Sequence, residues 1–198
     1  MMPNLAEIYD RAFFQEWGRH NEKYVSTARK IASHLYEVFR PKRIADVGCG
    51  CGIYAHLFRS FGVEVLAIDG VLPPAQEAFV GDVVLRDLTE PFPNEWGEFD
   101  FSLCFDVAEH IPENFVDVYL SNLTGLSDTL LLSAAPPNQG GTHHVNERPK
   151  RYWVGRLEKH GMIYQREKTG LIVEHFKRNK PGFMWMCQHI SVYERKSA

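Results

Sequence analysis

Three glycines at alternate positions, Gly48, Gly50 and Gly52, follow directly on a short apolar segment of the chain. That segment, Arg43–Val47, is predicted to form a buried strand, and Tyr54–Ser60 after the glycines is predicted to form a helix. Glycine tolerates positive φ angles and lets a ligand approach the main chain closely, and the first N–H groups of a helix have no partner within the helix. A strand, a glycine loop and a helix in this order therefore predict the entrance to a nucleotide-type pocket.

The next predicted strand, Glu64–Asp69, ends in an acid about 20 residues beyond the first glycine, where doubly wound folds bind ribose hydroxyl groups. The loop does not match the dinucleotide pattern G-x-G-x-x-G, because its third glycine would fall at Ile53. It does not match a phosphate-binding loop either, since no lysine follows the glycines. A glycine-rich turn in an ordinary α/β protein is the alternative, and Asp69 weighs against it.

Two later loops with acidic residues also follow predicted strands. Asp82–Leu85 is predicted as a third short strand, and Asp87 just beyond it could accept a hydrogen bond from an adenine amino group. Phe99–Phe105 has the apolar density of a central buried strand, and the loop 106–112 follows it at once. Ligands of open α/β sheets bind beyond the carboxyl ends of the strands, so we expect this loop to face the reacting centre.

Three histidines lie in loops that follow predicted strands: His110 after the fourth strand, and His143 and His144 after the fifth. Histidine titrates near neutral pH, so each of the three is a candidate general base. The alternative for His110 is a structural role in anchoring its loop. The alternative for His143 and His144 is that they are exposed to solvent or hold their own loop in place. Glu109 is expected to cap the turn that follows it. Asp106, Glu109 and the later two histidines could converge on a metal ion, but their spacing matches no established ligand pattern, and we expect no metal site.

The elements that must position these groups alternate along the chain. Lys23–Phe39 has apolar residues at helical spacing and is expected to pack on the sheet, whereas the aromatic helix Tyr9–Trp17 could either pack there or close over the ligand as a lid. Alternating strands and helices favour a parallel sheet with helices on both faces. The remaining predicted elements are the helices Phe115–Leu126 and Lys150–His160 and the strands Thr129–Ser133, Gly170–His175 and Cys187–Glu194.

Length and composition narrow the class of protein. At 198 residues, 44% of them hydrophobic, the chain can form one domain with a substantial core. A net charge of −3 gives no overall basic field, so nucleic acid is not an expected partner. No apolar run approaches the roughly 18 residues of a membrane span, and residues 1–10 lack the apolar core of a signal peptide. The four cysteines have no paired C-x-x-C spacing, so we expect reduced thiols in a cytoplasmic protein without a membrane partner.

Four motifs stand in order along the chain: DVGCGCG from Asp46, the acid Asp69, RDLTEPF from Arg86 and FDVAEHIP from Phe105. Together they resemble the motifs of class I S-adenosylmethionine-dependent methyltransferases of the small single-domain type. The resemblance covers about residues 43–137 and implies a Rossmann-like, doubly wound, mostly parallel seven-stranded α/β sheet, with S-adenosylmethionine as the cofactor. The residues that it assigns to the cofactor are Asp46, Gly48, Cys49, Gly50 and Gly52 in the glycine loop, Asp69 and Gly70 at the ribose, Asp87 and Leu88 at the adenine, and Phe105 and Asp106 at the methionine end.

The resemblance is less specific beyond Pro137. The stretch HHVNERPKRYW from His143 resembles methyltransferases that modify saccharides and secondary metabolites, which implies O-methylation of a saccharide or another small polar metabolite. A protein or RNA methyltransferase and a non-catalytic cofactor-binding partner subunit remain as alternatives. No Asn-Pro-Pro-Tyr-type motif follows the fourth strand, and the intact acids and glycines weigh against the non-catalytic alternative. The expected organisation is a single domain with N-terminal helices that could form a lid (1–40), a cofactor-binding core (41–137) and an acceptor-side segment (138–198).

Overall fold

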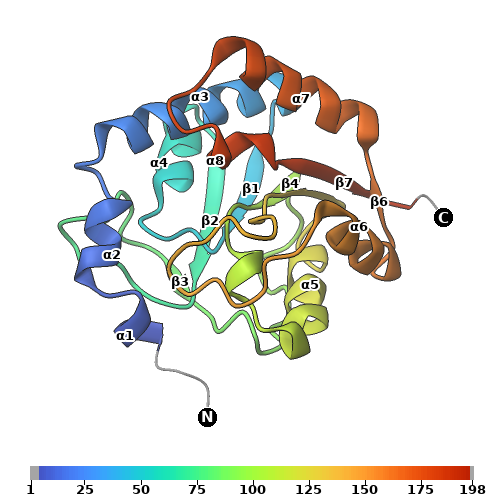
Figure 1. Cartoon of the computed structure of the whole chain (residues 1–198), viewed down its shortest axis with the longest axis horizontal. Coiled ribbons are helices and arrows are strands. Elements are labelled where there is room, and N and C mark those ends of the chain that lie inside the picture. Colours follow the sequence, from blue (N-terminus) through green and yellow to red (C-terminus); the bar gives the residue numbers. More distant parts are fainter. Residues whose placement is uncertain (1–4, 197–198) are drawn as a thin grey trace.

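One sheet of seven strands forms the centre of the molecule, in the order β3-β2-β1-β4-β5-β7-β6 (Figure 1). The computed structural model describes residues 5–196. The first five strands pair in parallel, and β7 pairs antiparallel with both β5 and β6. The predicted Rossmann-like, mostly parallel sheet is therefore confirmed. The strands are β1 (Arg43–Val47), β2 (Glu64–Asp69), β3 (Val84–Leu85), β4 (Phe101–Cys104), β5 (Thr129–Leu132), β6 (Met162–Tyr164) and β7 (Ser191–Arg195).

Helices cover both faces of the sheet, and a separate cluster of buried side chains lies beneath each layer. The helices are α1 (Leu5–Ile8), α2 (Arg11–Glu16), α3 (Glu22–Phe39), α4 (Ile53–Ser60), α5 (Val116–Thr124), α6 (Lys150–Lys159), α7 (Arg166–Asn179) and α8 (Trp185–Gln188), with the 3₁₀ turns η1 (Ala108–His110) and η2 (Glu113–Phe115). Helices α3, α4, α7 and α8 contribute to one cluster, and α5 and α6 contribute to the other (Figure 1). In β1, Ile44 packs in the first cluster and Ala45 in the second, because successive strand residues point to opposite faces. Within residues 5–196, no helix has the length and apolar character needed to cross a bilayer.

The strand order reverses beside β1, and open α/β sheets bind ligands at such a reversal. From β1 the chain moves outward through β2 to β3, then returns and adds β4 on the other side of β1. This path places the loops after β1 and β4 next to each other at one edge of the sheet. The contact is close: a Cβ atom at Gly48 would lie 2.4 Å from Cγ2 of Val107.

The N-terminal segment folds largely as its sequence predicts. Lys23–Phe39 is confirmed as helical by α3, which buries Ala28 and Leu35 against the sheet. The aromatic segment before it forms α2, and the side chain of Asp10 caps this helix by accepting a hydrogen bond from the N–H of Phe13 at 3.0 Å. Whether this segment moves as a lid stays a prediction.

In the C-terminal third, one predicted strand is wrong and another is only partly right. Gly170–His175, predicted as a strand, lies inside α7, where Ile172 and Phe176 are buried four residues apart while Leu171 is 68% exposed. That spacing is helical, and only a short apolar run within it imitates a buried strand. The predicted strand Cys187–Glu194 is half right, because α8 occupies its start and β7 occupies the rest. The edge strand β6 has no counterpart among the predicted elements.

Candidate active site

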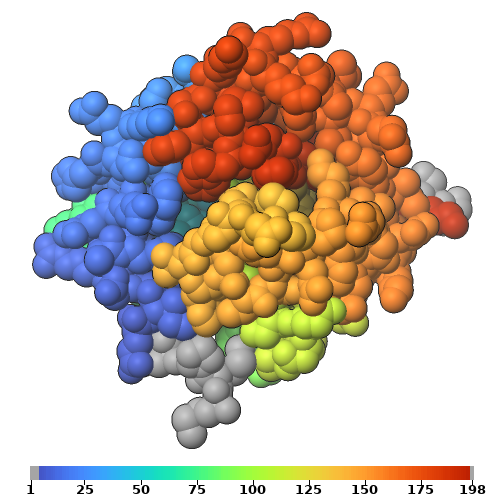
Figure 2. Space-filling view, viewed as in Figure 1, coloured from blue at the N-terminus to red at the C-terminus, as the bar shows by residue number. Residues whose placement is uncertain are grey.

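A cavity of about 450 Å³ opens at the carboxyl ends of β1 and β4. Its walls come from the glycine loop, from α2, from the loops that follow β4 and β5, and from α8. In the space-filling view a hollow lies between the N-terminal segment in blue, residues 138–149 in gold and the segment around α8 in red (Figure 2). The cavity thus lies at the edge of the sheet where we expect the nucleotide pocket and the reacting centre.

The glycine loop offers bare backbone to the cavity. Gly50 lines the cavity with a φ of +55°, and no atom lies within 4 Å of the place where a Cβ would sit. Gly48 also lines it, with a φ of +73° that favours glycine. Cys49 contributes to the same wall, whereas Gly52 caps α4 and is not among the lining residues. A ligand can therefore approach the main chain of this loop directly.

Two acids flank the loop, of which Asp46 is buried and Asp106 is half-buried. Asp46 is 2% exposed and accepts a hydrogen bond from the N–H of Ala55 at 3.0 Å, and burial raises its pKa to about 7. Asp106 has a left-handed φ of +55° and accepts a hydrogen bond from the Ser133 hydroxyl at 2.9 Å. Burial raises the pKa of Asp106 as well. Phe105 and both acids line the cavity, and among its lining residues in the described part of the chain there is no lysine or arginine. The lining is therefore acidic and without a basic counter-charge.

The acids predicted for the ribose and the adenine lie outside the cavity lining. Asp69 accepts hydrogen bonds from the N–H groups of Gly50 at 2.7 Å and Val71 at 2.9 Å. Asp87 is exposed and accepts from the N–H and the hydroxyl of Thr89 at 2.8 and 2.6 Å. These contacts shape the two loops. Nearby, a Cβ at Gly70 would lie 3.3 Å from Cδ1 of Leu5 in α1, and Leu88 is buried in the core.

Glu109, His110 and His144 meet at the opposite wall of the cavity. One ligand-type atom from each of them lies within 4.8 Å of the others. Glu109 is 1% exposed, and burial raises its pKa. Burial and the neighbouring His144 lower the pKa of His110 to about 4, so its imidazole is neutral. Glu109 is expected to cap the following turn, but it lies buried within η1, and η2 has no side-chain cap.

His143, the third candidate base, is placed differently. Its φ of +56° is left-handed, and its carbonyl oxygen faces the ring of His110, with 3.2 Å between that oxygen and Nδ1. Its own ring lies 6.4 Å from that of Tyr9, centroid to centroid, and it is not among the lining residues. Of the three histidines, the fold thus brings His110 and His144 to the cavity and leaves the imidazole of His143 outside.

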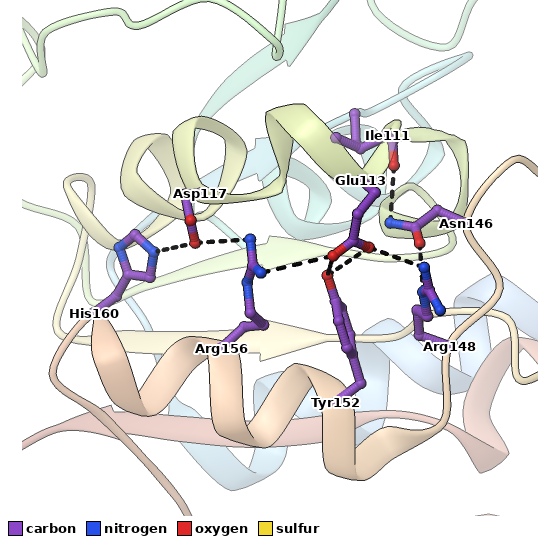
Figure 3. Close-up of polar contacts among 8 residues, drawn as sticks. All are labelled: Ile111, Glu113, Asp117, Asn146, Arg148, Tyr152, Arg156 and His160. Atoms are coloured by element: carbon purple, nitrogen blue, oxygen red, sulfur yellow. Dashed lines mark hydrogen bonds and ion pairs between the residues drawn. The ribbon is translucent and has the colours of Figure 1, made fainter.

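A polar network holds the loop that carries His144 (Figure 3). The buried amide of Asn146 donates to the carbonyl oxygen of Ile111 at 3.0 Å and accepts from Nε of Arg148 at 2.8 Å. Arg148, Tyr152 and Arg156 all contact the carboxylate of Glu113, and Arg156 and His160 contact Asp117. These contacts tie α6 and the preceding loop to η2 and α5, and so fix where His144 sits.

Aromatic residues complete the cavity, and most of them were not predicted as site residues. Phe13, Phe14 and Trp17 come from the N-terminal segment, whose aromatic run is visible in the sequence and led to the lid hypothesis. Trp185 and Met186 come from α8, a one-turn helix without a sequence signal of its own. Tyr24 and Tyr54 lie near the starts of α3 and α4 and also line the cavity.

Part of the sequence that forms the cavity matches a known type of domain. A family model described as a methyltransferase domain matches residues 45–123, which run from β1 to α5. Ubiquinone biosynthesis O-methyltransferase of Acinetobacter baumannii (strain AYE) is 32% identical over 81 residues, which are 36% of this chain and 34% of that protein. The protein of the same name from Erwinia tasmaniensis is 30% identical over 91 residues, 42% of this chain and 37% of the relative. These matches therefore span only about a third of the length of the curated relatives.

Solved structures match over nearly the whole chain. Magnesium protoporphyrin IX methyltransferase from Synechocystis PCC 6803, with bound S-adenosylhomocysteine, has a TM-score of 0.63 at 19% identity and covers 97% of this chain and 93% of its own. The 1,6-didemethyltoxoflavin-N1-methyltransferase of Burkholderia thailandensis, with bound 1,6-didemethyltoxoflavin and S-adenosylhomocysteine, has a TM-score of 0.62 at 17% identity and covers 100% and 93%. Residues 45–123 thus match a methyltransferase domain, and the chain as a whole has the fold of these solved methyltransferases.

The resemblance to class I methyltransferases seen in the sequence is thereby confirmed, and both of these solved neighbours hold S-adenosylhomocysteine, the product form of the expected cofactor. The matched span contains the glycine loop, Asp69 and the loop with Glu109 and His110. His144 and α8 lie beyond it. The segments that bring His144 and α8 to the cavity therefore lie outside the residues that the family model matches.

Proposed function

We propose that this methyltransferase transfers a methyl group from S-adenosylmethionine to a hydroxyl oxygen of a small acceptor. The observation that carries the proposal is that one cavity joins the glycine loop to the group formed by Glu109, His110 and His144. Cofactor and acceptor would share one enclosed space, which an in-line displacement requires. The relatives named ubiquinone biosynthesis O-methyltransferase support oxygen as the acceptor atom.

The acidic lining suits the charge of the cofactor. S-adenosylmethionine carries a sulfonium and an ammonium group, and the buried Asp46 and the half-buried Asp106 line the cavity with no basic residue among the described lining residues. We assign the methionine end to Gly48, Cys49, Gly50, Phe105 and these two acids. Following the family resemblance, we assign the ribose to Asp69 and Gly70 and the adenine to Asp87 and Leu88. Asp69 can still accept from ribose hydroxyl groups, because each carboxylate oxygen has two lone pairs and uses one here.

The reaction needs a group that removes a proton from the acceptor. The acceptor oxygen attacks the methyl carbon, the O–CH₃ bond forms as the S–CH₃ bond breaks, and the cofactor leaves as S-adenosylhomocysteine. The hydroxyl proton must leave the same oxygen. His110 and His144 are the imidazoles that line the cavity, so we place the acceptor oxygen beside them.

The aromatic wall favours an acceptor with a flat ring. Phe13, Trp17 and Trp185 line the acceptor side, and aromatic side chains pack well against planar ligands. Two residues that could stack on a sugar are used elsewhere: Trp153 is buried in the core, and Tyr152 donates its hydroxyl to Glu113 at 2.8 Å. We therefore propose a hydroxylated ring compound as the acceptor in preference to a saccharide.

Two measurements test this function. Calorimetric titration with S-adenosylmethionine and S-adenosylhomocysteine should show one binding site per chain for each, and binding of neither would refute the proposal. Incubation with methyl-labelled cofactor and a panel of phenols, hydroxylated heterocycles and sugars, followed by mass spectrometry, should show label on a ring hydroxyl. Label on sugars alone would agree with O-methylation but would refute the proposal that the acceptor is a hydroxylated ring compound.

A further inference from the structure

Three side chains of the kind that bind metal ions surround a small space in the cavity. A carboxylate oxygen of Glu109 and one ring nitrogen each of His110 and His144 lie within 4.8 Å of one another. Ligand atoms that share one divalent cation at about 2.1 Å lie roughly 3–4 Å apart. A small closing movement of side chains would therefore bring all three to bonding distance of one ion.

One oxygen of the buried Glu109 carboxylate has no partner among the described residues. The residue is 1% exposed, and its Oε2 atom has no hydrogen-bond partner. Burying a carboxylate oxygen without a hydrogen bond or a counter-charge is costly. No lysine or arginine of the described chain lines this cavity, so a bound cation would supply the counter-charge that the lining lacks.

The two imidazoles are oriented as metal ligands are. Nδ1 of His110 lies 3.2 Å from the carbonyl oxygen of His143, and Nδ1 of His144 lies 2.9 Å from a carboxylate oxygen of Glu147. Carbonyl and carboxylate oxygens only accept, so both Nδ1 atoms carry a hydrogen, and the neutral form of each ring offers its Nε2 lone pair to a cation. Histidines that bind metals through one nitrogen usually donate the other N–H to such an oxygen, which fixes the ring.

Backbone hydrogen bonds hold the loop with Glu109 and His110 against the loop with His144. Glu109 and His144 are 35 positions apart, yet the carbonyl oxygen of Glu109 accepts hydrogen bonds from the N–H groups of Val145 at 3.0 Å and Asn146 at 2.9 Å. Glu147 in turn accepts from the N–H groups of Asn138 and Gly140, both at 2.7 Å. The ligand-type atoms are therefore positioned before any ligand binds.

We propose that Glu109, His110 and His144 bind one divalent cation of the first transition series, with at least one coordination position open to the cavity. Two imidazoles and a carboxylate suit Zn²⁺, Mn²⁺ or Co²⁺ and do not suit Mg²⁺, which prefers oxygen ligands. The role of the ion rests on the proposed function: the acceptor oxygen would take the open position. A cation there makes a bound hydroxyl more acidic and orients it.

Titration with Co²⁺ tests the site directly. The protein is made without a polyhistidine tag, freed of metal with a chelator, and titrated while visible absorption is recorded. We expect one Co²⁺ per chain, with absorption bands that differ from those of the hydrated ion. Absence of bound Co²⁺ would overturn the proposal.

Variants locate the ion. Glu109→Gln and His144→Gln should each weaken Co²⁺ binding by at least tenfold, because each removes a ligand, and Glu147→Gln should weaken it by about tenfold through the loss of ring orientation. His143→Asn is the matched control, since it removes the adjacent imidazole, keeps the carbonyl and tolerates the left-handed backbone; it should bind Co²⁺ as the wild type does. Wild-type affinity in both ligand variants would refute the site. Circular dichroism checks the fold, and His144→Gln, in a surface loop, keeps the test decisive if Glu109→Gln does not fold.

Calorimetry with S-adenosylhomocysteine on the same samples separates this proposal from the methyltransferase function. A protein that binds S-adenosylhomocysteine and no Co²⁺ keeps the proposed function and loses the metal site. A protein that binds Co²⁺ and neither S-adenosylhomocysteine nor S-adenosylmethionine keeps the metal site and loses the proposed function.

Discussion

The carboxylate of Asp69 accepts a hydrogen bond from the N–H of Gly50 at 2.7 Å, which joins the end of β2 to the loop after β1. Its other oxygen accepts from the N–H of Val71 at 2.9 Å. Burial raises the pKa of Asp69, and these backbone donors partly offset the effect. One side chain therefore shapes the glycine loop and, in the proposed function, also faces the ribose of the cofactor.

Removal of this carboxylate should weaken cofactor binding. Asp69→Ala is expected to lower the affinity for S-adenosylhomocysteine by at least about tenfold, since hydrogen bonds to charged groups contribute roughly 1.5–3 kcal/mol each. Isothermal calorimetry measures the change. Asp82→Ala is the matched control, because this acid is exposed and pairs with Arg59 on the surface. It should keep wild-type affinity, and equal affinity of Asp69→Ala would remove the ribose assignment.

The cofactor position on the glycine loop can be tested by adding a single methyl group. Gly50 and Gly62 both have positive φ, +55° and +84°, and a Cβ at either would meet no atom within 4 Å. Gly50→Ala and Gly62→Ala should therefore lower the free energy of unfolding by similar amounts, about 1 kcal/mol. Only Gly50 lines the cavity, so only Gly50→Ala should weaken S-adenosylhomocysteine binding. Urea denaturation and calorimetry measure the two effects, and unchanged binding in Gly50→Ala would contradict the placement.

Asp46 predicts a pH dependence of stability. Burial raises its pKa from 3.8 to about 7; Asp69 adds to the rise, while the N–H of Ala55 and the charge of Arg59 oppose it. Between these two pH values the folded state holds the proton and the unfolded state does not. The stabilisation from the bound proton is therefore complete below about pH 4 and is lost as the pH rises through 7.

The Asp46→Asn variant cannot lose this proton, and its amide oxygen can still accept from Ala55. Since one pKa unit corresponds to about 1.4 kcal/mol, its free energy of unfolding should rise relative to the wild type by roughly 2–4 kcal/mol between pH 4 and pH 8. Urea denaturation of both proteins at the two pH values gives the difference, in which contributions from other acids largely cancel. A difference that does not change with pH would show that Asp46 is not costly when ionised.

The first half of the fold could be predicted because its signals are local. Arg43–Val47 and Glu64–Asp69 are the bounds of β1 and β2 as well as of the predicted strands. Gly170–His175 is wrongly predicted as a strand because its local signal is ambiguous: a short apolar run fits a strand or a helix equally well. Burial of Ile172 and Phe176 against distant residues decides in favour of the helix, and no local pattern records that burial.

In the site as well, some residues can be predicted from local sequence patterns, and others are brought together only by the fold. The glycines and the acids at strand ends can be found from type and spacing, because the parallel sheet brings strand ends to one edge. The meeting of Glu109 with His144 depends on a loop closure that the sequence does not encode at any fixed spacing. The separate placement of His143 depends on its left-handed φ of +56°, which turns two adjacent histidines in different directions.

That loop closure supports a last prediction, on Asn146. Its buried side chain joins the carbonyl of Ile111 to Arg148, so Asn146→Ala should loosen the loop that carries His144 and leave the glycine loop intact. We expect turnover to fall at least tenfold, affinity for S-adenosylhomocysteine to stay within about twofold, and hydrogen exchange at the N–H of Val145 to accelerate. Asn94→Ala is the control, because the Asn94 amide also joins two segments, by donating to the carbonyl oxygens of Gly97 and Gly125, and is not among the cavity-lining residues. Its turnover should match the wild type, and normal turnover in Asn146→Ala with faster exchange would show that the position of His144 does not limit the reaction.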